Sequence, residues 1–405
     1  MNYGAGESLQ LDGPVEFARS IGSETAEMSH SGPGDLAKRA LESPLDYPPL
    51  ASCLAPGDHI ALAVAEGLPA AGQVIGGLLA ALESAGVAPE RIVALCEAKS
   101  DQVRLEGDLA AWRDRGVRFQ THAPGDADQL CFAGVRHNDH ELLLGRPLVE
   151  AEVAIPVTCS RAGEGRTARV FDGFYPAFAD SASRQDGLNH KDDEPSGRFK
   201  TAADEAGWLL GVTLAVQVVP QVGGGVAAVY AGPSDAVSNA AAGLTDDLWT
   251  RRVATRSPLV IAAVAGDADQ QTWTSVARAI QTAERVAEPE AAIALCTTLS
   301  EPLDEDLARR LVSMDEEDWL PTEDQSVTED DRPTAEAAQL IAAARRRGPV
   351  YLMSRLDPDW VEDIGLAPVA NERELSRLIA RRGGAVVIED AQHVSVELSS
   401  VEAVL

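Results

Sequence analysis

The fold is decided by the stretch from residue 59 to residue 96, which reads HIALAVAEGLPAAGQVIGGLLAALESAGVAPERIVALC. His59–Ala65 is a short apolar run that predicts a buried strand, and Arg91–Cys96 predicts a second one. Between them, Ala70–Ala85 has the length and amphipathic spacing of a helix. Because two strands joined through a helix pair in parallel, the stretch predicts an α/β fold.

The loops that follow these two strands are the expected place for a ligand. In open α/β sheets, small molecules bind beyond the carboxyl ends of the strands. Here those ends are the loops 66–69 and 97–101, which read EGLP and EAKSD. Lys99 and Ser100 are therefore candidate substrate-binding residues.

A second unit of the same kind begins near residue 257. Leu259–Val264 and Ala291–Cys296 predict strands, and Thr272–Val286 predicts the helix between them. The predicted class is α/β, with two α/β domains that contain mixed sheets and enclose an interdomain cleft. We expect residues 1–256 to form the first domain, 257–390 the second, and 391–405 a C-terminal segment for which a return to the first domain is one option.

The composition narrows the range of partners. With 405 residues, 45% of them apolar, the chain can bury large cores and exceeds the usual size of one domain. A formal net charge of −30 repels phosphate backbones and anionic lipids, so neither nucleic acid nor a membrane is an expected partner. The sequence has no apolar run of membrane-spanning length and no secretion signal, which predicts a cytoplasmic protein. A local arginine cluster can nevertheless hold a small anion.

Three patterns that resemble functional motifs have simpler interpretations. His137 and His140 have a metal-like spacing, but the Asn-Asp between them is typical of a turn. Gly223–Gly225 precedes VAAVY and not a helix, which favours a hairpin turn over a phosphate-binding loop. The five cysteines are odd in number and widely spaced, which excludes a disulfide framework and a CxxC metal site.

The segment from Val170 to His190, VFDGFYPAFADSASRQDGLNH, has the form of a cofactor loop downstream of the strand Val153–Val157. With other motifs in the same order, it makes the chain resemble the nickel-dependent lactate racemase family of 2-hydroxyacid racemases. The resemblance covers most of the chain and depends on the order of the motifs, since no single one is decisive. The other motifs are Ser43-Pro44, Pro56-Gly57-Asp58, GLLAALESAGV, His122, GRPLVEAEVAIPV, Pro176, Asn189-His190, Gly232–Asp235 and Gly266-Asp267-Ala268-Asp269.

The resemblance implies two α/β domains with a cleft, and a nickel pincer on a nicotinic-acid-derived ring that is tethered through a thioamide to a lysine. Asp172 stands where that lysine is expected and cannot form the thioamide, and Ser100 stands where the family has a proton-carrying histidine. His190 matches the family's nickel ligand. The family's substrate arginine, and a glutamine and a lysine of its second domain, are replaced by Leu68, Thr274 and Ala277. The chain is therefore predicted to be a divergent member, and the implied cofactor, the nickel-pincer nucleotide, is not expected.

The candidate site residues lie in the strand-end loops. Asp172 and His190 are the candidates for proton transfer, and His190 is also the candidate for metal binding. For any one candidate taken alone, a solvated loop residue is the favoured interpretation. The candidates for holding a substrate anion are Lys99, Ser100, Arg161, Arg166 and Arg169.

Two functions of different class follow from these residues. The first is a non-catalytic or altered binding protein that holds a small anion, such as a hydroxyacid or a sugar acid, in the cleft. The second is a divergent racemase or epimerase that acts on such an acid. The sequence favours the first, because the residues at the positions of the tether lysine, the substrate arginine and the proton carriers differ together: Ser100 stands at one proton-carrier position, and residues 158–165, where the resemblance places another, contain no histidine. The oligomeric state is left open.

Overall fold

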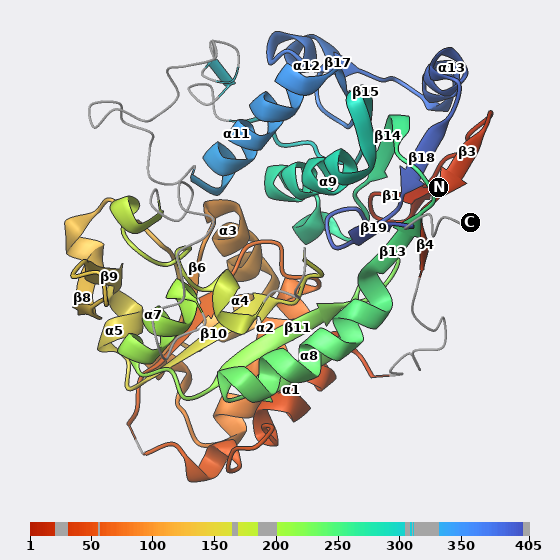
Figure 1. Cartoon of the computed structure of the whole chain (residues 1–405). Coiled ribbons are helices and arrows are strands. Elements are labelled where there is room, and N and C mark those ends of the chain that lie inside the picture. The colour runs from red at the N-terminus through yellow and green to blue at the C-terminus, as the bar shows by residue number, and fades with distance from the viewer. Residues whose placement is uncertain are drawn as a thin grey trace.

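The computed structural model describes residues 1–20, 31–55, 57–163, 169–184, 201–303, 308, 309, 311 and 332–399. Two six-stranded sheets, each with helices packed against it, form the two halves of the molecule (Figure 1). This arrangement confirms the predicted α/β class. Among the described residues, no helix combines the length and the apolar character needed to cross a bilayer.

The first sheet contains both strands of the stretch 59–96. Neighbouring strands of this sheet run parallel except for one antiparallel pair at an edge, so the sheet is mixed as expected. In spatial order the strands are β12 (Val226–Gly232), β11 (Ala215–Pro220), β10 (Val153–Cys159), β5 (Ile60–Val64), β6 (Ile92–Cys96) and β7 (Arg118–Thr121), with β12 antiparallel to β11.

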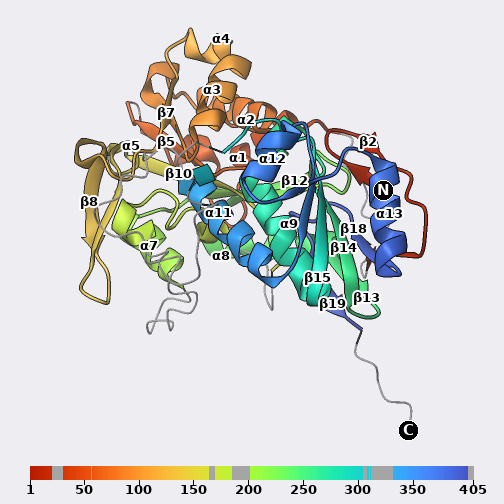
Figure 2. The same cartoon turned by 90° about the horizontal axis from the view of Figure 1, so that it is seen from above.

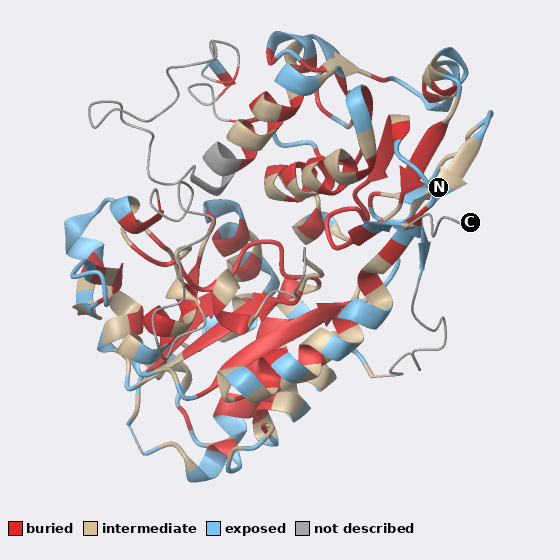
Figure 3. Cartoon of the chain, viewed as in Figure 1, coloured by how far each residue is buried: buried red, intermediate tan, exposed pale blue. Residues whose placement is uncertain are grey.

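Helices and a hairpin cover both faces of this sheet, and Figure 3 shows its central strands as buried. Alternate residues of β5 point to opposite faces. One face packs against α1 (Pro33–Glu42), α2 (Ala71–Ser84) and α3 (Lys99–Asp108). A strand covered on both faces has to be apolar throughout, which is why residues 60–64 form an unbroken apolar run. The other face packs against α5 (Arg146–Glu150), the 3-10 helix η4 (Val170–Gly173), α7 (Ala202–Leu210) and α8 (Ser234–Trp249).

The predicted turns are confirmed. β8 (Leu130–Val135) and β9 (Glu141–Gly145) form an antiparallel hairpin, and Asp139 in its turn has a φ of 62°. The Nδ1 atom of His137 lies 2.7 Å from a carboxylate oxygen of Glu205, which orients this histidine within the hairpin. Gly223–Gly225 all have positive φ and connect β11 to β12. All five cysteines are free thiols.

The second sheet is parallel throughout. Two of its helices, α9 (Trp273–Val286) and α11 (Arg332–Arg347), pack against each other over one face (Figure 2). α13 (Glu372–Arg382) covers the other face. In spatial order the strands are β17 (Ala367–Pro368), β16 (Val350–Met353), β15 (Ala287–Cys296), β14 (Ser257–Ala263), β18 (Ala385–Ile388) and β3 (Val15–Phe17).

The N-terminal segment crosses into the second half. β3 pairs with β18, whereas the predicted boundaries assign its residues to the first domain. Such a short strand carries no sequence signal for its partner, and the otherwise open edge of β18 decides the pairing. The division of the chain at residue 256 stays a prediction.

The C-terminal segment returns to the connection between the halves. β19 (Ser395–Leu398) pairs with β13 (Thr250–Val253), the strand that directly follows α8. β4 (Arg19–Ser20) pairs with the other edge of β13 and completes a small third sheet. β4 and β19, one from each terminal part of the chain, therefore meet at β13, where the first half leads into the second.

Candidate functional site

Loops at the carboxyl ends of the two sheets contact each other directly. The backbone N–H of Ala70 donates to Asp267 Oδ2 at 3.0 Å. The next N–H, of Ala71, donates to Asp269 Oδ2 at 3.2 Å. Carboxylates are stabilising at a helix N-terminus because of the helix dipole. The loop after β14 thus caps α2 of the opposite half, which brings the strand-end loops of both halves together.

Glu66, which follows β5, lies at the centre of this junction. Its side chain is buried, and its Oε2 accepts a hydrogen bond from Thr274 Oγ1 of the second half at 2.8 Å. Its backbone N–H donates to Glu97 Oε2 at 2.9 Å. Burial and the nearby charge of Glu97 raise the pKa of the Glu66 carboxyl. This carboxyl therefore keeps its proton to a higher pH than an exposed glutamate does.

A cavity of about 340 Å³ lies beside Glu66 and is lined from both halves. Lys99 and Ser100, in the first turn of α3, contribute from the first half. Thr272 and Trp273, at the start of α9, contribute from the second half. The structure therefore brings two of the predicted site residues into one interdomain cavity. The remaining lining residues are Ala5, Glu66, Ala98, Arg104, Ala268, Gln271, Thr298, Leu299, Ser300, Glu301, Pro302 and Arg355.

Arg104 links the two halves at the edge of this cavity. Its guanidinium pairs with Asp101 on the same helix, and its Nε lies 2.7 Å from Asp269 Oδ1 of the other half. Burial and the charge of Glu66 raise the pKa of the Asp101 carboxyl to about 7. Arg104 opposes this rise but does not cancel it. Asp101 is therefore a buried acid that ionises close to physiological pH.

We expect the stability of the protein to fall as the pH rises towards neutrality, with Asp101 as one cause. The folded state holds the Asp101 proton up to about pH 7, whereas the unfolded chain releases it near 3.8, so folding loses this advantage between those values. The variant Asp101→Asn keeps an acceptor for Arg104 and cannot ionise. Urea unfolding at about pH 5.5 and about pH 8 should show a smaller loss of stability in the variant. Equal losses in both proteins would contradict this account of Asp101.

Arg161 follows β10 and lies behind Glu66, outside the residues that line the cavity. Its Nη2 donates to the backbone oxygen of Glu66 at 3.4 Å. Arg278, from α9, approaches the same place. A Cβ added to Gly67 would lie 3.8 Å from Arg161 Nη2 and 3.8 Å from Arg278 Nη1. The predicted anion-binding arginine therefore has a second arginine beside it.

Arg169 and Asp172 have contacts within the first half. Arg169 forms ion pairs with Asp204 at 3.4 Å and with Asp235 at 2.6 Å. The Asp172 carboxylate accepts the backbone N–H of Arg169 at 2.8 Å and so caps η4. Their proposed roles in binding and proton transfer stay predictions. His190 and Arg166 lie outside the described residues.

Three residues of this junction had no place among the predicted site residues. Thr274 and Arg278 are one helical turn apart on α9, a spacing that by itself indicates only a shared face. His393 comes from the C-terminal segment and is buried beside them. Their sequence positions carry no signal, because a strand in the first half and a helix in the second come together only in the folded chain.

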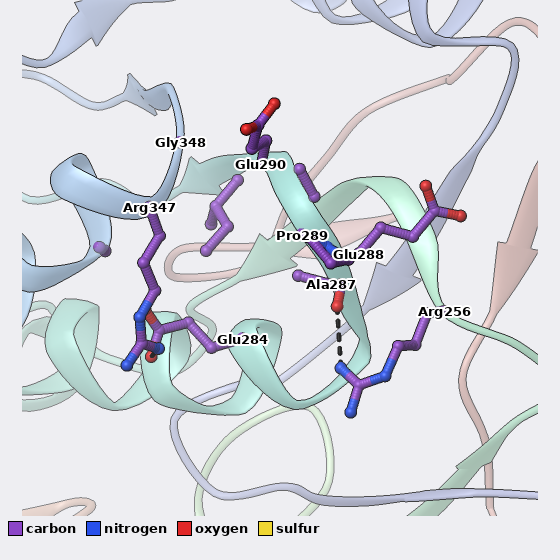
Figure 4. A pocket seen from close by; sticks show the side chains of 11 residues that line it. Arg256, Glu284, Ala287, Glu288, Pro289, Glu290, Arg347 and Gly348 are labelled. Carbon is purple, nitrogen blue, oxygen red and sulfur yellow. Dashed lines mark hydrogen bonds and ion pairs between the residues drawn. The ribbon is translucent and has the colours of Figure 1, made fainter.

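Another cavity, of about 410 Å³, lies at the opposite end of the second sheet (Figure 4). Its arginines already have partners: Arg347 pairs with Glu284 at 2.8 Å, and Arg256 donates to the backbone oxygen of Ala287 at 2.8 Å. It adjoins the amino ends of β15 and β16, whereas ligands of α/β sheets bind at the carboxyl ends. The interdomain cavity is therefore the stronger candidate.

The arrangement of the two halves is similar to that of two solved structures. At a TM-score of 0.68, the chain is similar to the lactate racemase apoprotein from Thermoanaerobacterium thermosaccharolyticum, with 14% sequence identity and coverage of 98% of this chain and 99% of that chain. It is also similar to a protein from Thermotoga maritima, with a TM-score of 0.58, 12% identity and coverage of 90% and 98%. No protein-family model and no curated protein matches the chain. At these identities the likeness shows the fold, and at that level it confirms the resemblance seen in the sequence.

Proposed function

We propose that this protein binds a small organic anion of the hydroxyacid or sugar-acid type in the interdomain cavity, without the tethered nickel cofactor. The observation that carries the proposal is Lys99, an ammonium group at the open N-terminus of α3 that faces the other half across the cavity. A cavity of about 340 Å³ lies within the usual range for small-molecule sites.

Lys99 differs from the other cations that line this cavity. Arg104 pairs with Asp101 and Asp269, and Arg355 pairs with Glu7. Lys99 Nζ donates instead to the neutral side-chain oxygen of Gln102 at 2.9 Å, and within the described residues no carboxylate lies within 4 Å of it. Its charge is therefore available to a ligand. One cation of this kind suits a ligand with one anionic group.

The backbone and the neighbouring hydroxyl groups support the same ligand class. No side chain caps α3 at Ala98, so the N–H groups of its first turn are open to an anion. Ser100, Thr272, Thr298 and Ser300 bring hydroxyl groups to the cavity wall, and hydroxyl groups both donate and accept hydrogen bonds. A ligand that combines a carboxylate with hydroxyl groups matches this lining.

The residues at the matched cofactor positions do not fit the tethered group that the resemblance implies. A thioamide needs an amine, and Asp172 supplies a carboxylate whose oxygen already accepts the Arg169 N–H. Within the described part of the chain, no three His, Cys, Asp or Glu side chains gather as metal ligands would. We therefore derive no reaction step through nickel.

The test is the variant Lys99→Gln, with Lys38→Gln as the matched control. Lys38 is half-exposed on α1 and pairs there with Glu42, so its loss removes the same charge outside the residues that line the cavity. Thermal-shift and calorimetric titrations with lactate, tartrate, gluconate and galacturonate should detect a binder. We expect Lys99→Gln to weaken its binding by about tenfold or more, and Lys38→Gln to leave it unchanged. The proposal would be overturned if none of the four acids bound the unaltered protein, or if both variants bound the ligand equally well.

The same protein preparation distinguishes binding from the alternative of a divergent racemase. Protein from nickel-supplemented cells should show the unmodified chain mass and no lactate racemisation. A covalent mass addition together with bound nickel would favour the racemase and would overturn the reading of Asp172.

A further inference from the structure

The guanidinium groups of two arginines from opposite halves approach Gly67, next to Glu66, and neither arginine is among the residues that line the cavity. Because a nitrogen of each lies 3.8 Å from the same point above Gly67, the Nη atoms of Arg161 and Arg278 are within about 8 Å of each other, less than a screening length in physiological salt. Burial and the charge of Arg161 lower the pKa of Arg278 to about 10. Arg161 and Arg278 are both half-buried, and two like charges held this close and partly removed from solvent require compensation.

The structure does not supply that compensation at short range. Among the described residues, no carboxylate lies within 4 Å of either guanidinium, although the chain as a whole carries a net charge of −30. Arg161 Nε is buried and has no hydrogen-bond partner there. The carboxylates of Glu66 and Glu97 act on Arg278 from farther away, and both have other partners. Glu66 accepts from Thr274, and Glu97 accepts the Glu66 N–H and faces Arg184 at 3.7 Å.

His393 adds a third polar group without a complete set of partners. It is 5% exposed, and its Nε2 lies 2.7 Å from Gln270 Oε1. The amide nitrogen of Gln270 donates to the backbone oxygen of Gly67 at 2.6 Å, so Oε1 is the acceptor and His393 Nε2 is the donor. The Nδ1 atom of His393 is buried and has no partner. Burial, Arg161 and Arg278 together lower the pKa of this imidazole, which keeps it neutral.

We propose that Arg161 and Arg278 hold a compact oxyanion, of the size of bicarbonate or phosphate, in a site behind Glu66 that is formed by both halves. Its oxygens accept from the two guanidinium groups, and an O–H on the same ion can donate to His393 Nδ1. Guanidinium is well suited to such ions because its N–H groups match the spacing of two oxygens. Arg161 comes from the first half, and Arg278 and His393 come from the second. A bound oxyanion therefore holds the halves together.

The test uses the full chain in a HEPES buffer without added halide, with phosphate, bicarbonate and chloride titrated at matched ionic strength. The melting temperature of the unaltered protein should rise with phosphate or bicarbonate concentration as mass action requires. Arg278→Gln and Arg161→Gln should each reduce the apparent affinity at least tenfold. Arg252→Gln is the control, because Arg252 is an exposed arginine that pairs with Glu397 at 3.4 Å on the small third sheet. A response in the two site variants equal to that of Arg252→Gln would overturn the proposal.

Two further variants, Arg278→Lys and Lys99→Gln, complete the test. If Arg278→Gln does not fold, Arg278→Lys retains the charge without the planar fork, and equilibrium dialysis with labelled phosphate should show weaker binding than in the unaltered protein; equal binding would count against the site. Lys99→Gln separates this site from the proposed cavity function. A free inorganic oxyanion binds this variant normally, whereas competition between phosphate and the organic ligand would identify the oxyanion as the carboxylate end of that ligand. If Lys99→Gln shows that the cavity proposal is wrong, the proposal for the arginine site is unaffected. If the arginine variants show that the oxyanion proposal is wrong, the cavity proposal is unaffected.

Discussion

Replacing Trp249 by alanine is expected to lower the free energy of unfolding by about 3–5 kcal/mol, the range for removing a large buried aromatic side chain. Trp249 is the last residue of α8 and is fully buried. Although α8 packs on the first sheet, this side chain belongs to the apolar core of the second half. Its loss therefore leaves a cavity at the point where the two halves join.

The contacts of Trp249 allow a graded control. Its indole N–H donates to the backbone oxygen of Pro220 at 3.1 Å, and its ring centroid lies 5.1 Å from that of His393. Trp249→Phe keeps an aromatic ring but loses the hydrogen bond, and should cost less than Trp249→Ala. Chemical denaturation of the three proteins measures both steps. A cost below about 1 kcal/mol for Trp249→Ala would contradict the packing described here.

Replacing Gly77 by alanine is expected to cost about 3 kcal/mol, the upper end of the usual range for overpacking. Gly77 is buried on α2 where this helix crosses α1. A Cβ at this position would overlap the backbone carbonyl oxygen of Gly34 on α1. Backbone atoms cannot rotate away as a side-chain end can, so α1 and α2 would have to move apart.

The adjacent glycine provides a matched control in the same helix. A Cβ on Gly76 would meet the Cδ2 atom of Leu109 at 3.2 Å, and this atom is the end of a flexible side chain. Because alanine favours the helix over glycine by up to about 1 kcal/mol, Gly76→Ala should leave stability nearly unchanged or raise it. Urea unfolding of both variants compares them directly. Similar costs at the two positions would show that the crossing of α1 and α2 is looser than described.

Much of the fold could be predicted because its signals are local. The apolar runs of β5, β6, β14 and β15 and the helices between them follow from the burial of parallel strands on both faces. The turns at Asp139 and at Gly223–Gly225 could be predicted because they require positive φ, which few residues tolerate. The pairing of β3 with β18 could not be predicted, because three residues cannot specify a partner.

Only the residues that the first half contributes to the candidate site could be predicted from the sequence. Lys99 and Ser100 follow a predicted strand, so their place at the carboxyl edge of the first sheet could be inferred. Arg161 could be inferred for the same reason, but its neighbour Arg278 could not, because Arg278 lies in the middle of a helix of the other half. The same holds for His393, which enters with the C-terminal segment.

The sequence by itself determined the α/β class, the strand-end loops and the presence of a carboxylate, Asp172, where the resemblance leads one to expect a lysine. Each of these is a property of residues close together along the chain. Only the tertiary structure decided which side chains face each other across the halves. Arg161 lies near Arg278 and His393, and Lys99 lies across the cavity from the start of α9. Both arrangements depend on the loop at Asp267 and Asp269, which binds the N-terminus of α2. The physical reason is that charge compensation and hydrogen bonding depend on distance in space, and these partners are more than 100 residues apart in sequence.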